Sequence, residues 1–319
     1  MFIIPYIKKR LGISTHFSVK LFVRDLWNYL FTKGYKNSRE WYFKWNKEYK
    51  PQLDLDHNLK KTILPNPVRI DILITCLPKD VDILPLTIKS IFEHIKHKID
   101  TIYIVSPEGK EIQDYCKSNH YTFVNEKEVL GFDKNYIKYE VNGLDRSGWL
   151  LQQLLKLSGD TICKNEHFLV VDADTLFIKP RTFKIDKKTI IDFSDEYHLP
   201  YYRTYEKLLK LKHRSPVSFI CHYMLFEKKK LRSLKLHIEN IHKDKWYDAI
   251  INNIDPFESS SFSEFETYAN FVLEKYRKEY ILEYWFNKSL NRIESNIDTE
   301  ITHLNHKYKT VSYHTYNMV

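Results

Sequence analysis

The chain has 319 residues, enough for one large domain or two smaller ones. Hydrophobic residues make up 43% and charged residues 29%, so the chain can bury a sizeable core and does not have the composition of a disordered protein. Only seven glycines occur, and none forms part of a G-x-G-x-x-G or G-x-x-x-x-G-K-[ST] pattern. The usual dinucleotide and P-loop sites therefore lack their main signal.

The cysteine and hydropathy patterns indicate a cytoplasmic location. No stretch of about 18 apolar residues predicts a transmembrane helix. The first residues place their apolar stretch before the basic ones, the reverse of a secretory signal. Cys76, Cys116, Cys163 and Cys221 lie far apart and include no C-x-x-C pair, which argues against a zinc framework and against a disulfide-stapled domain.

The net charge of +9 is concentrated near the amino terminus. Residues 1–67 contain 13 Lys/Arg and 5 Asp/Glu, whereas the rest of the chain contains 37 and 36. Within this segment, residues 17–31 predict an aromatic-rich amphipathic helix with basic flanks, of the type that lies on an anionic membrane surface. A helical extension packed on the main domain is the alternative. Nucleic-acid binding is disfavoured because the rest of the chain is neutral and carries no recognition motif.

We expect a basic helical extension and linker over residues 1–67, with the linker at 50–67, and one main domain over 68–319. In the main domain, strands are predicted at 69–76, 101–105, 121–124 and 167–177, and helices at 84–99, 111–119 and 146–157. Alternating strands and helices predict an α/β fold with a mostly parallel sheet flanked by helices. Further on, 189–193, 218–226 and 310–314 are strand-like and 264–276 is helical.

An aspartate pair interrupts the most hydrophobic predicted strand. Asp172 and Asp174 follow the apolar run 168–171, and residues two apart on a strand share a face. Two carboxylates at the carboxyl end of a parallel strand repel each other unless a cation lies between them, and hard oxygen ligands suit Mg²⁺ or Mn²⁺. The pattern therefore predicts a metal site that holds a diphosphate. In a loop, the same short pattern would carry no meaning.

The segment VVDADTLFIKP (170–180) resembles the D-x-D region of GT-A glycosyltransferases. The strands that precede it match the order of their nucleotide-binding half. Four segments at 147–157, 170–177, 218–226 and 262–271 together are similar to a poorly characterised family of bacterial glycosyltransferase-like proteins associated with capsule and lipopolysaccharide assembly. The resemblance covers roughly residues 68–316. It implies a GT-A-like, Rossmann-like domain that moves a sugar from a nucleotide-diphosphate donor to a glycan, plausibly a lipid-linked one.

The resemblance also implies a set of metal and donor ligands. Asp172 would contact the ribose or the metal, Asp174 would ligate a Mn²⁺ or Mg²⁺ that bridges the two phosphates, and His314 would be a further ligand. Thr75 and Asp80 occupy the region where related enzymes hold the nucleotide base. The chain lacks the H-x-x-G-x-x-K-P-W type of ending found in some of these families.

Further candidates come from the residue types themselves. Gln153 and Lys156 lie in a leucine-rich helix and suit sugar hydroxyls or phosphate, although a solvated face is the alternative. Arg146 caps this helix or meets a diphosphate. His222 is either a substrate contact or a core histidine. If the reaction inverts the anomeric centre, Glu264, and after it Glu266, is the candidate base; in a retaining reaction neither needs that role.

Two other functions compete with glycosyl transfer. Phosphoryl transfer of the haloacid-dehalogenase type also uses an aspartate pair after an apolar strand, but Leu176 stands where that motif has Thr or Val. A catalytically inactive, membrane-docked transferase-like domain is the second alternative. The prediction is a metal-dependent glycosyltransferase, peripheral on the inner face of the cell membrane, that binds a nucleotide sugar and a glycan acceptor and no nucleic acid.

Overall fold

The computed structural model describes residues 65–194, 196, 198–215, 217–291, 302–304 and 307–314, with the side chains of Asn291 and His314 not described. The predicted helix at 17–31 and nearly all of the predicted extension and linker therefore lie outside the described residues. Asn66 and Pro67, assigned to the linker by sequence, belong instead to the first strand. The first strand thus begins three residues before the strand predicted at 69–76.

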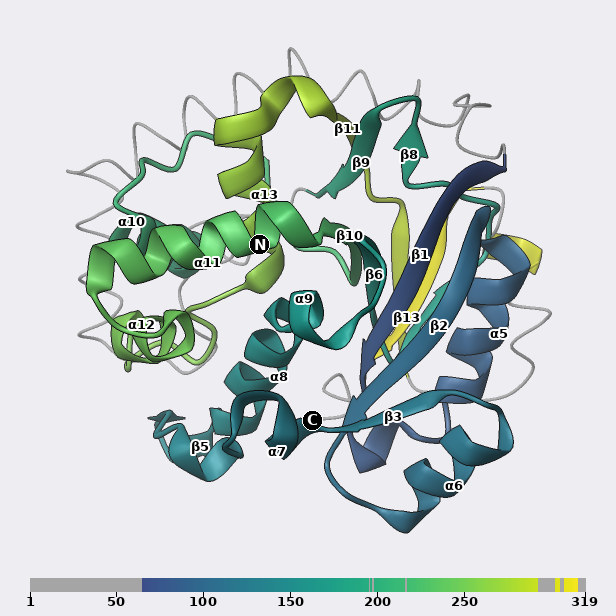
Figure 1. Cartoon of the computed structure of the whole chain (residues 1–319), viewed down its shortest axis with the longest axis horizontal. Coiled ribbons are helices and arrows are strands. Elements are labelled where there is room, and N and C mark those ends of the chain that lie inside the picture. Colours follow the sequence, from purple (N-terminus) through teal and green to yellow (C-terminus); the bar gives the residue numbers. More distant parts are fainter. Residues whose placement is uncertain are drawn as a thin grey trace, which may run out of the picture.

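The core of the fold is a five-stranded, mostly parallel sheet (Figure 1). Its strands are β1 (Asn66–Thr75), β2 (His97–Ser106), β3 (Thr122–Asn125), β6 (His167–Asp172) and β10 (Tyr223–Glu227), in the order β10-β6-β1-β2-β3. Only β10 runs antiparallel to its neighbour. The expected α/β fold with a mostly parallel sheet is confirmed.

Helices cover the sheet on both sides. Figure 1 shows α8 and α9 on one side of β1 and β2 and α5 on the other. None of the helices in the described part of the chain combines the length and hydrophobicity needed to span a bilayer. The helices are α5 (Leu84–His94), α6 (Lys110–Ser118), α7 (Glu126–Leu130), α8 (Ser147–Leu157), α9 (Gly159–Ile162), α10 (Leu199–Leu209), α11 (Lys228–His242), α12 (Trp246–Asn253) and α13 (Glu264–Tyr276), with short 3-10 turns η4 (Pro78–Asp80), η5 (Lys134–Tyr136) and η6 (Arg277–Glu279).

Three small sheets complete the described part of the fold. One has the order β11-β9-β8, the second β12-β13-β7, and the third is the hairpin β4-β5. Their strands are β4 (Glu140–Val141), β5 (Leu144–Asp145), β7 (Thr175–Phe177), β8 (Lys184–Ile185), β9 (Lys188–Phe193), β11 (Tyr280–Tyr284), β12 (Asn287–Asn291) and β13 (Thr310–His314).

Strand β6 is the buried centre of the domain. Its residues Phe168 to Val171 are fully buried, and each such side chain contributes about 1.5–3 kcal/mol on burial. The Phe168 ring stacks on Phe226 of β10, with centroids 5.5 Å apart. Gly159 of α9 lies directly against the Phe168 ring, and a Cβ at that position would overlap with the ring atoms. The backbone of α9 therefore approaches β6 closely only because this residue has no side chain.

Two predicted elements are shorter than the sequence pattern indicates. The helix expected over 84–99 stops at His94, and residues from His97 onward form β2, because β2 pairs with β1 over most of its length. The strand expected over 218–226 is regular only from Tyr223. Long-range pairing fixed these boundaries, and the helical spacing of Ile95 and Ile99 could not reveal it.

The strand expected over 167–177 is broken at the aspartate pair. β6 ends at Asp172, Ala173 and Asp174 form a turn, and β7 joins a different sheet, where it pairs with β13. The prediction that the two carboxylates share one face of a single strand is therefore wrong. Asp172 ends the central sheet, and Asp174 lies in the turn beyond it.

Candidate functional site

A group of polar side chains surrounds the carboxyl end of the central strands. Asp172, the last residue of β6, lies beside Thr75, the last residue of β1. The backbone N–H of Asp172 donates to the carbonyl oxygen of His222, 2.8 Å away, just before β10 begins. Three segments that are distant in sequence thus meet at the edge where open α/β sheets bind ligands.

Lys156 connects two acidic groups at this edge. It comes from the last turn of α8, and its Nζ lies 2.6 Å from Oδ1 of Asp172 and 2.9 Å from Oε1 of Glu264, the first residue of α13. The side chain of Lys156 is only 7% exposed and that of Glu264 only 1%. Burial alone would lower the pKa of the Lys156 ammonium, but the two carboxylates outweigh it and raise that pKa. The cation is therefore permanently charged.

Gln153 completes the surroundings of Glu264. It lies on α8 three residues before Lys156, and with its amide nitrogen turned toward Glu264 it donates to both carboxylate oxygens. Burial raises the pKa of Glu264, and the nearby Lys156 ammonium only partly offsets that effect. The Glu264 carboxyl group is thus held by an amide and an ammonium, with almost no exposed surface.

His222 contacts Asp172 from the opposite side. Its Nδ1 lies 3.0 Å from Oδ2 of Asp172, and its ring meets Trp285 edge-on with centroids 4.9 Å apart. Burial would lower the pKa of His222, but the hydrogen bond to Asp172 and the acidic surroundings raise it. Burial likewise opposes ionisation of Asp172, yet Lys156 and His222 together hold the pKa of that carboxyl far below its ordinary value. Asp172 is therefore an ionised carboxylate that is paired with the Lys156 ammonium and contacts the His222 ring.

Asp174 lies next to the last described strand. β13 pairs antiparallel with β7, and the N–H of Tyr313 donates to the carbonyl oxygen of Asp174 at 3.0 Å. The backbone of His314, the next residue, is consequently beside the aspartate turn, while its side chain lies outside the described residues. Among the described residues, no group of three or more His, Cys, Asp or Glu side chains is arranged to hold a metal ion. Metal ligation by Asp172, Asp174 and His314 stays a prediction.

Glu266 is held in a different environment. Its carboxylate is 1% exposed and accepts hydrogen bonds from Ser218 Oγ (2.5 Å), Phe219 N (2.9 Å), Tyr202 OH (3.1 Å) and Asn270 Nδ2 (3.0 Å). Burial raises its pKa to about 7 against the effect of these donors. Three of the four donors bind Oε1, and two of these, Ser218 and Phe219, belong to the segment before β10, so these contacts are those of a group that fixes that segment.

The remaining candidates lie around the same edge. Thr75 is buried at the end of β1, and Asp80 is half-buried in η4 immediately after it. Arg146 precedes α8: its Nε donates to the Ser259 carbonyl oxygen at 2.6 Å, and its guanidinium lies 4.6 Å from the centre of the Trp149 ring. Arg146 therefore secures the loop before α13 in addition to preceding α8.

Sequence reasoning missed Trp285. Its indole Nε1 is buried and has no hydrogen-bond partner in the described part of the chain, and its ring contacts His222. No motif surrounds this tryptophan, so only the fold, which brings the end of β11 next to the segment before β10, could have indicated it.

Comparisons with known proteins complete this description. Residues 71–308 match the model of a family described as "Family of unknown function (DUF6492)". No curated protein matches the chain. Among solved structures, the chain is similar to apo mouse xyloside xylosyltransferase 1, with a TM-score of 0.44, 11% identity, and coverage of 79% of this chain and 100% of that one.

The chain is also similar to galactosyltransferase LgtC in complex with donor and acceptor sugar analogues, with a TM-score of 0.41, 10% identity, and coverage of 76% of this chain and 87% of that one. An active-site mutant of LgtC gives a TM-score of 0.39 and 12% identity over the same shares. Because each TM-score lies below 0.5, function has to be inferred from the chain's own residues.

The ion-pair network around Lys156 predicts a specific pattern of stabilities. In Lys156→Met, Glu264 stays buried without a cation, and we expect a loss of about 3–5 kcal/mol in the free energy of unfolding. Adding Glu264→Gln removes the stranded charge, so the double variant should be more stable than Lys156→Met. Urea unfolding followed by circular dichroism measures both.

Lys89→Met is the matched control, because Lys89 forms an exposed ion pair with Glu93 at 3.8 Å and should cost less than about 1 kcal/mol. An equal loss of unfolding free energy in Lys156→Met and Lys89→Met would contradict the proposed ion-pair network. A double variant less stable than Lys156→Met would contradict it as well.

Proposed function

The chain belongs to the DUF6492 family, and we propose that it is a metal-dependent glycosyltransferase. It moves a sugar from a nucleoside-diphosphate donor to a growing bacterial surface glycan such as capsule, O-antigen or lipooligosaccharide. One observation carries the proposal: the polar residues of four separate segments converge on one sheet edge. These are Gln153 and Lys156 of α8, Asp172 of β6, His222 before β10 and Glu264 of α13.

Such convergence has a chemical meaning. A buried polar network of this size costs free energy to assemble, and a packed apolar core would do the purely structural work at least as well. Its position at the carboxyl ends of β1 and β6 is the place where parallel sheets bind nucleotides. The perturbed pKa values of Asp172, Lys156 and His222 at one edge are typical of a functional site.

The residue types at this edge suit a divalent cation. Asp172 and Asp174 supply hard carboxylate oxygens, and the β13–β7 pairing places the backbone of His314 beside Asp174. Mn²⁺ or Mg²⁺ held by these three residues would neutralise the charge that develops on the departing diphosphate. Because Lys156 and His222 already compensate Asp172, we assign the larger share of the metal's binding to Asp174 and His314.

The chain's own groups then have distinct tasks. Lys156 and His222 hold the Asp172 carboxylate in one orientation and keep it ionised. The Nε1 of Trp285, beside His222, has no partner among the described residues and would donate a hydrogen bond to the donor substrate. Thr75 and Asp80, at the end of β1, are assigned to the nucleotide base. Arg146 keeps the loop before α13 in place, and a diphosphate would have to compete with Ser259 for its guanidinium.

Of the two candidate bases, the contacts favour Glu264 as the residue that acts at the site. Glu264 belongs to the Lys156 network, whereas the carboxylate of Glu266 is occupied by four donors. With 1% of its side chain exposed, Glu264 reaches an acceptor only if the edge opens. In the described conformation its role is to position Lys156 and Gln153.

We further propose that residues 1–67 hold the protein on the inner face of the cell membrane, next to a lipid-linked acceptor. Their excess of basic over acidic residues, 13 against 5, and their tryptophans suit an anionic, interfacial surface.

The donor site predicts metal-dependent nucleotide binding. The full chain should show a thermal shift with one of UDP, GDP or CDP in the presence of Mn²⁺, corresponding to about 2.7 kcal/mol at a hundredfold excess over Kd. Asp174→Ala should abolish the shift, since it removes a metal ligand. Asp114→Ala, an exposed carboxylate on α6, should leave it unchanged. A shift that is the same in Asp174→Ala and the wild type, or none with any nucleotide, would rule out this site.

The membrane proposal predicts charge-dependent flotation. Replacing Lys8, Lys9 and Arg10 with alanine in the full chain should reduce co-flotation with phosphatidylglycerol vesicles, because each basic residue near the surface contributes about 1 kcal/mol. Phosphatidylcholine vesicles should bind neither protein. Unchanged flotation of the variant would exclude the amino-terminal segment as the membrane contact.

A further inference from the structure

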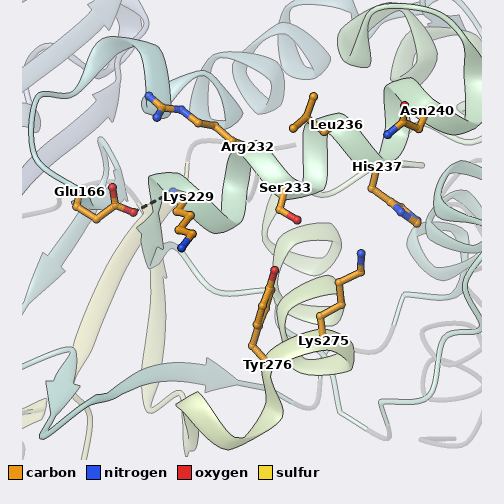
Figure 2. Close-up of a pocket in the computed structure, with 9 residues that line it drawn as sticks. All are labelled: Glu166, Lys229, Arg232, Ser233, Leu236, His237, Asn240, Lys275 and Tyr276. Atoms are coloured by element: carbon orange, nitrogen blue, oxygen red, sulfur yellow. Dashed lines mark hydrogen bonds between the residues drawn. The ribbon is translucent and has the colours of Figure 1, made fainter.

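A hollow on the surface of the molecule lies away from the Asp172 edge. It is a groove of about 630 Å³ between the outer face of α11 and the carboxyl-terminal end of α13. Figure 2 shows Lys229 and Ser233 of α11 and Lys275 and Tyr276 of α13 directed toward the same space between the two helices. Its volume lies within the usual range for small-ligand sites.

The groove is separated from the candidate active site by the length of a strand. Glu166, at its rim, immediately precedes β6, whereas Asp172 is the last residue of β6. Six strand residues span roughly 20 Å at about 3.3 Å per residue. A ligand in this groove therefore does not occupy the edge that holds Lys156 and Asp172.

The face of α11 that lines the groove follows from helical periodicity. Lys229, Ser233 and His237, with Arg232, Leu236 and Asn240, repeat at three- and four-residue intervals, which places them on one side of the helix. Leu231, Leu234 and Ile238 lie on the other side and are buried. The groove is thus the polar face of an amphipathic helix, and packing does not dictate its composition.

The basic residues of α11 divide into paired and unpaired groups. Lys230 forms ion pairs with Glu227 and Glu279, each at 2.8 Å, and Lys235 pairs with Asp160. Within the described part of the chain, no carboxylate forms an ion pair with Lys229 or Lys275, and both are exposed.

The acidic residue at the rim, Glu166, offsets only part of this charge. Oε1 of Glu166 accepts a hydrogen bond from the backbone N–H of Lys229 at 2.9 Å, so this carboxylate serves the first turn of α11. Arg232 is paired with Asp160, whose Oδ2 lies 3.5 Å from its Nε, so this guanidinium adds less free charge to the groove than Lys229 and Lys275 do. Because Lys229 and Lys275 stand against the single carboxylate of Glu166, the described lining of the groove carries a net positive charge.

Neutral polar groups and an aromatic ring accompany the cations. Ser233 and Asn240 offer a hydroxyl and an amide, which match the hydroxyl groups of sugars as donors and acceptors. Tyr276 adds a half-buried ring for an apolar sugar face. Lys229 and Lys275 suit carboxylate, phosphate or sulfate groups.

We propose that this groove binds an anionic oligosaccharide. A membrane surface fits it less well, because the charges line a recess and Leu236, 58% exposed, is the one large apolar side chain at the groove that the structure describes as exposed. Interfacial helices present a broad apolar face instead. The binding claim is independent of the transferase activity, so either can fail without the other.

The experiment measures binding of fluorescently labelled anionic oligosaccharides to the full chain by anisotropy. Heparin-derived octasaccharide and octameric sialic acid serve as sulfated and carboxylated probes, and a neutral maltooligosaccharide of the same length as the control. We expect at least one anionic probe to bind, with Lys229→Glu/Lys275→Glu weakening it by about tenfold or more. The loss should shrink in high salt.

Lys110→Glu/Lys117→Glu on α6 is the matched control, because it exchanges two exposed lysines with the same change in net charge. It should change affinity by less than about twofold. Equal weakening by both double variants would reduce the effect to net charge and overturn the proposal. The proposal would also fail if neither anionic probe bound. It would fail, too, if the groove bound only phosphatidylglycerol vesicles.

One further double variant distinguishes recognition of sugar hydroxyls from electrostatic attraction of any anion. Ser233→Ala/Asn240→Ala removes no charge, and we expect it to weaken the preferred oligosaccharide while leaving the binding of inorganic pyrophosphate unchanged. If the oligosaccharide binds this variant as tightly as the wild type, the groove does not recognise sugar hydroxyls and the proposal fails.

Discussion

The ammonium of Lys156 is the interaction on which the site depends. It is buried among α8, β6 and α13 and is shared by Asp172 and Glu264 at 2.6 and 2.9 Å. Each of these charges alone would be costly at such depth, since an unpaired buried ion is worth several kcal/mol of destabilisation. Removing one of the three charged groups therefore leaves the others without compensation and destabilises the packing of the three elements. Gln153 and His222 provide further hydrogen-bond contacts, Gln153 to the Glu264 carboxylate and His222 to the Asp172 carboxylate.

A second constraint comes from the point at which β6 ends. Because the turn at Ala173 and Asp174 directs the chain into a different sheet, the last described strand, β13, runs beside that turn. The backbone thereby joins Asp174 to the residue before His314. An aspartate from the middle of the chain and a histidine near its end become neighbours through two short antiparallel strands, and the metal site proposed here depends on this closure.

Much of the fold could be predicted from the sequence, because its signals are local. The β-branched run of β1, the helix from Glu264 to Tyr276 and the last strand appear where the residue pattern places them. The candidate residues Gln153, Lys156, Asp172, His222 and Glu264 also meet in space. The break after Asp172 could not be predicted, since pairing with β13, more than 130 residues later, produces it. Glu264 and Glu266 have different environments because different sides of α13 face Lys156 and the segment before β10. The two residues have the same chemistry, so the sequence alone could not distinguish them.

Turnover of nucleotide sugars tests the central claim most directly. The full chain would be incubated with Mn²⁺ and a panel of UDP-, GDP- and CDP-sugars, and the release of free nucleoside diphosphate followed over time. The account predicts slow release from one donor class, even to water as acceptor, and a loss of roughly 100-fold in Asp172→Asn. Metal-dependent nucleotide binding without release from any donor would contradict it and would identify the chain as an inactive transferase-like domain.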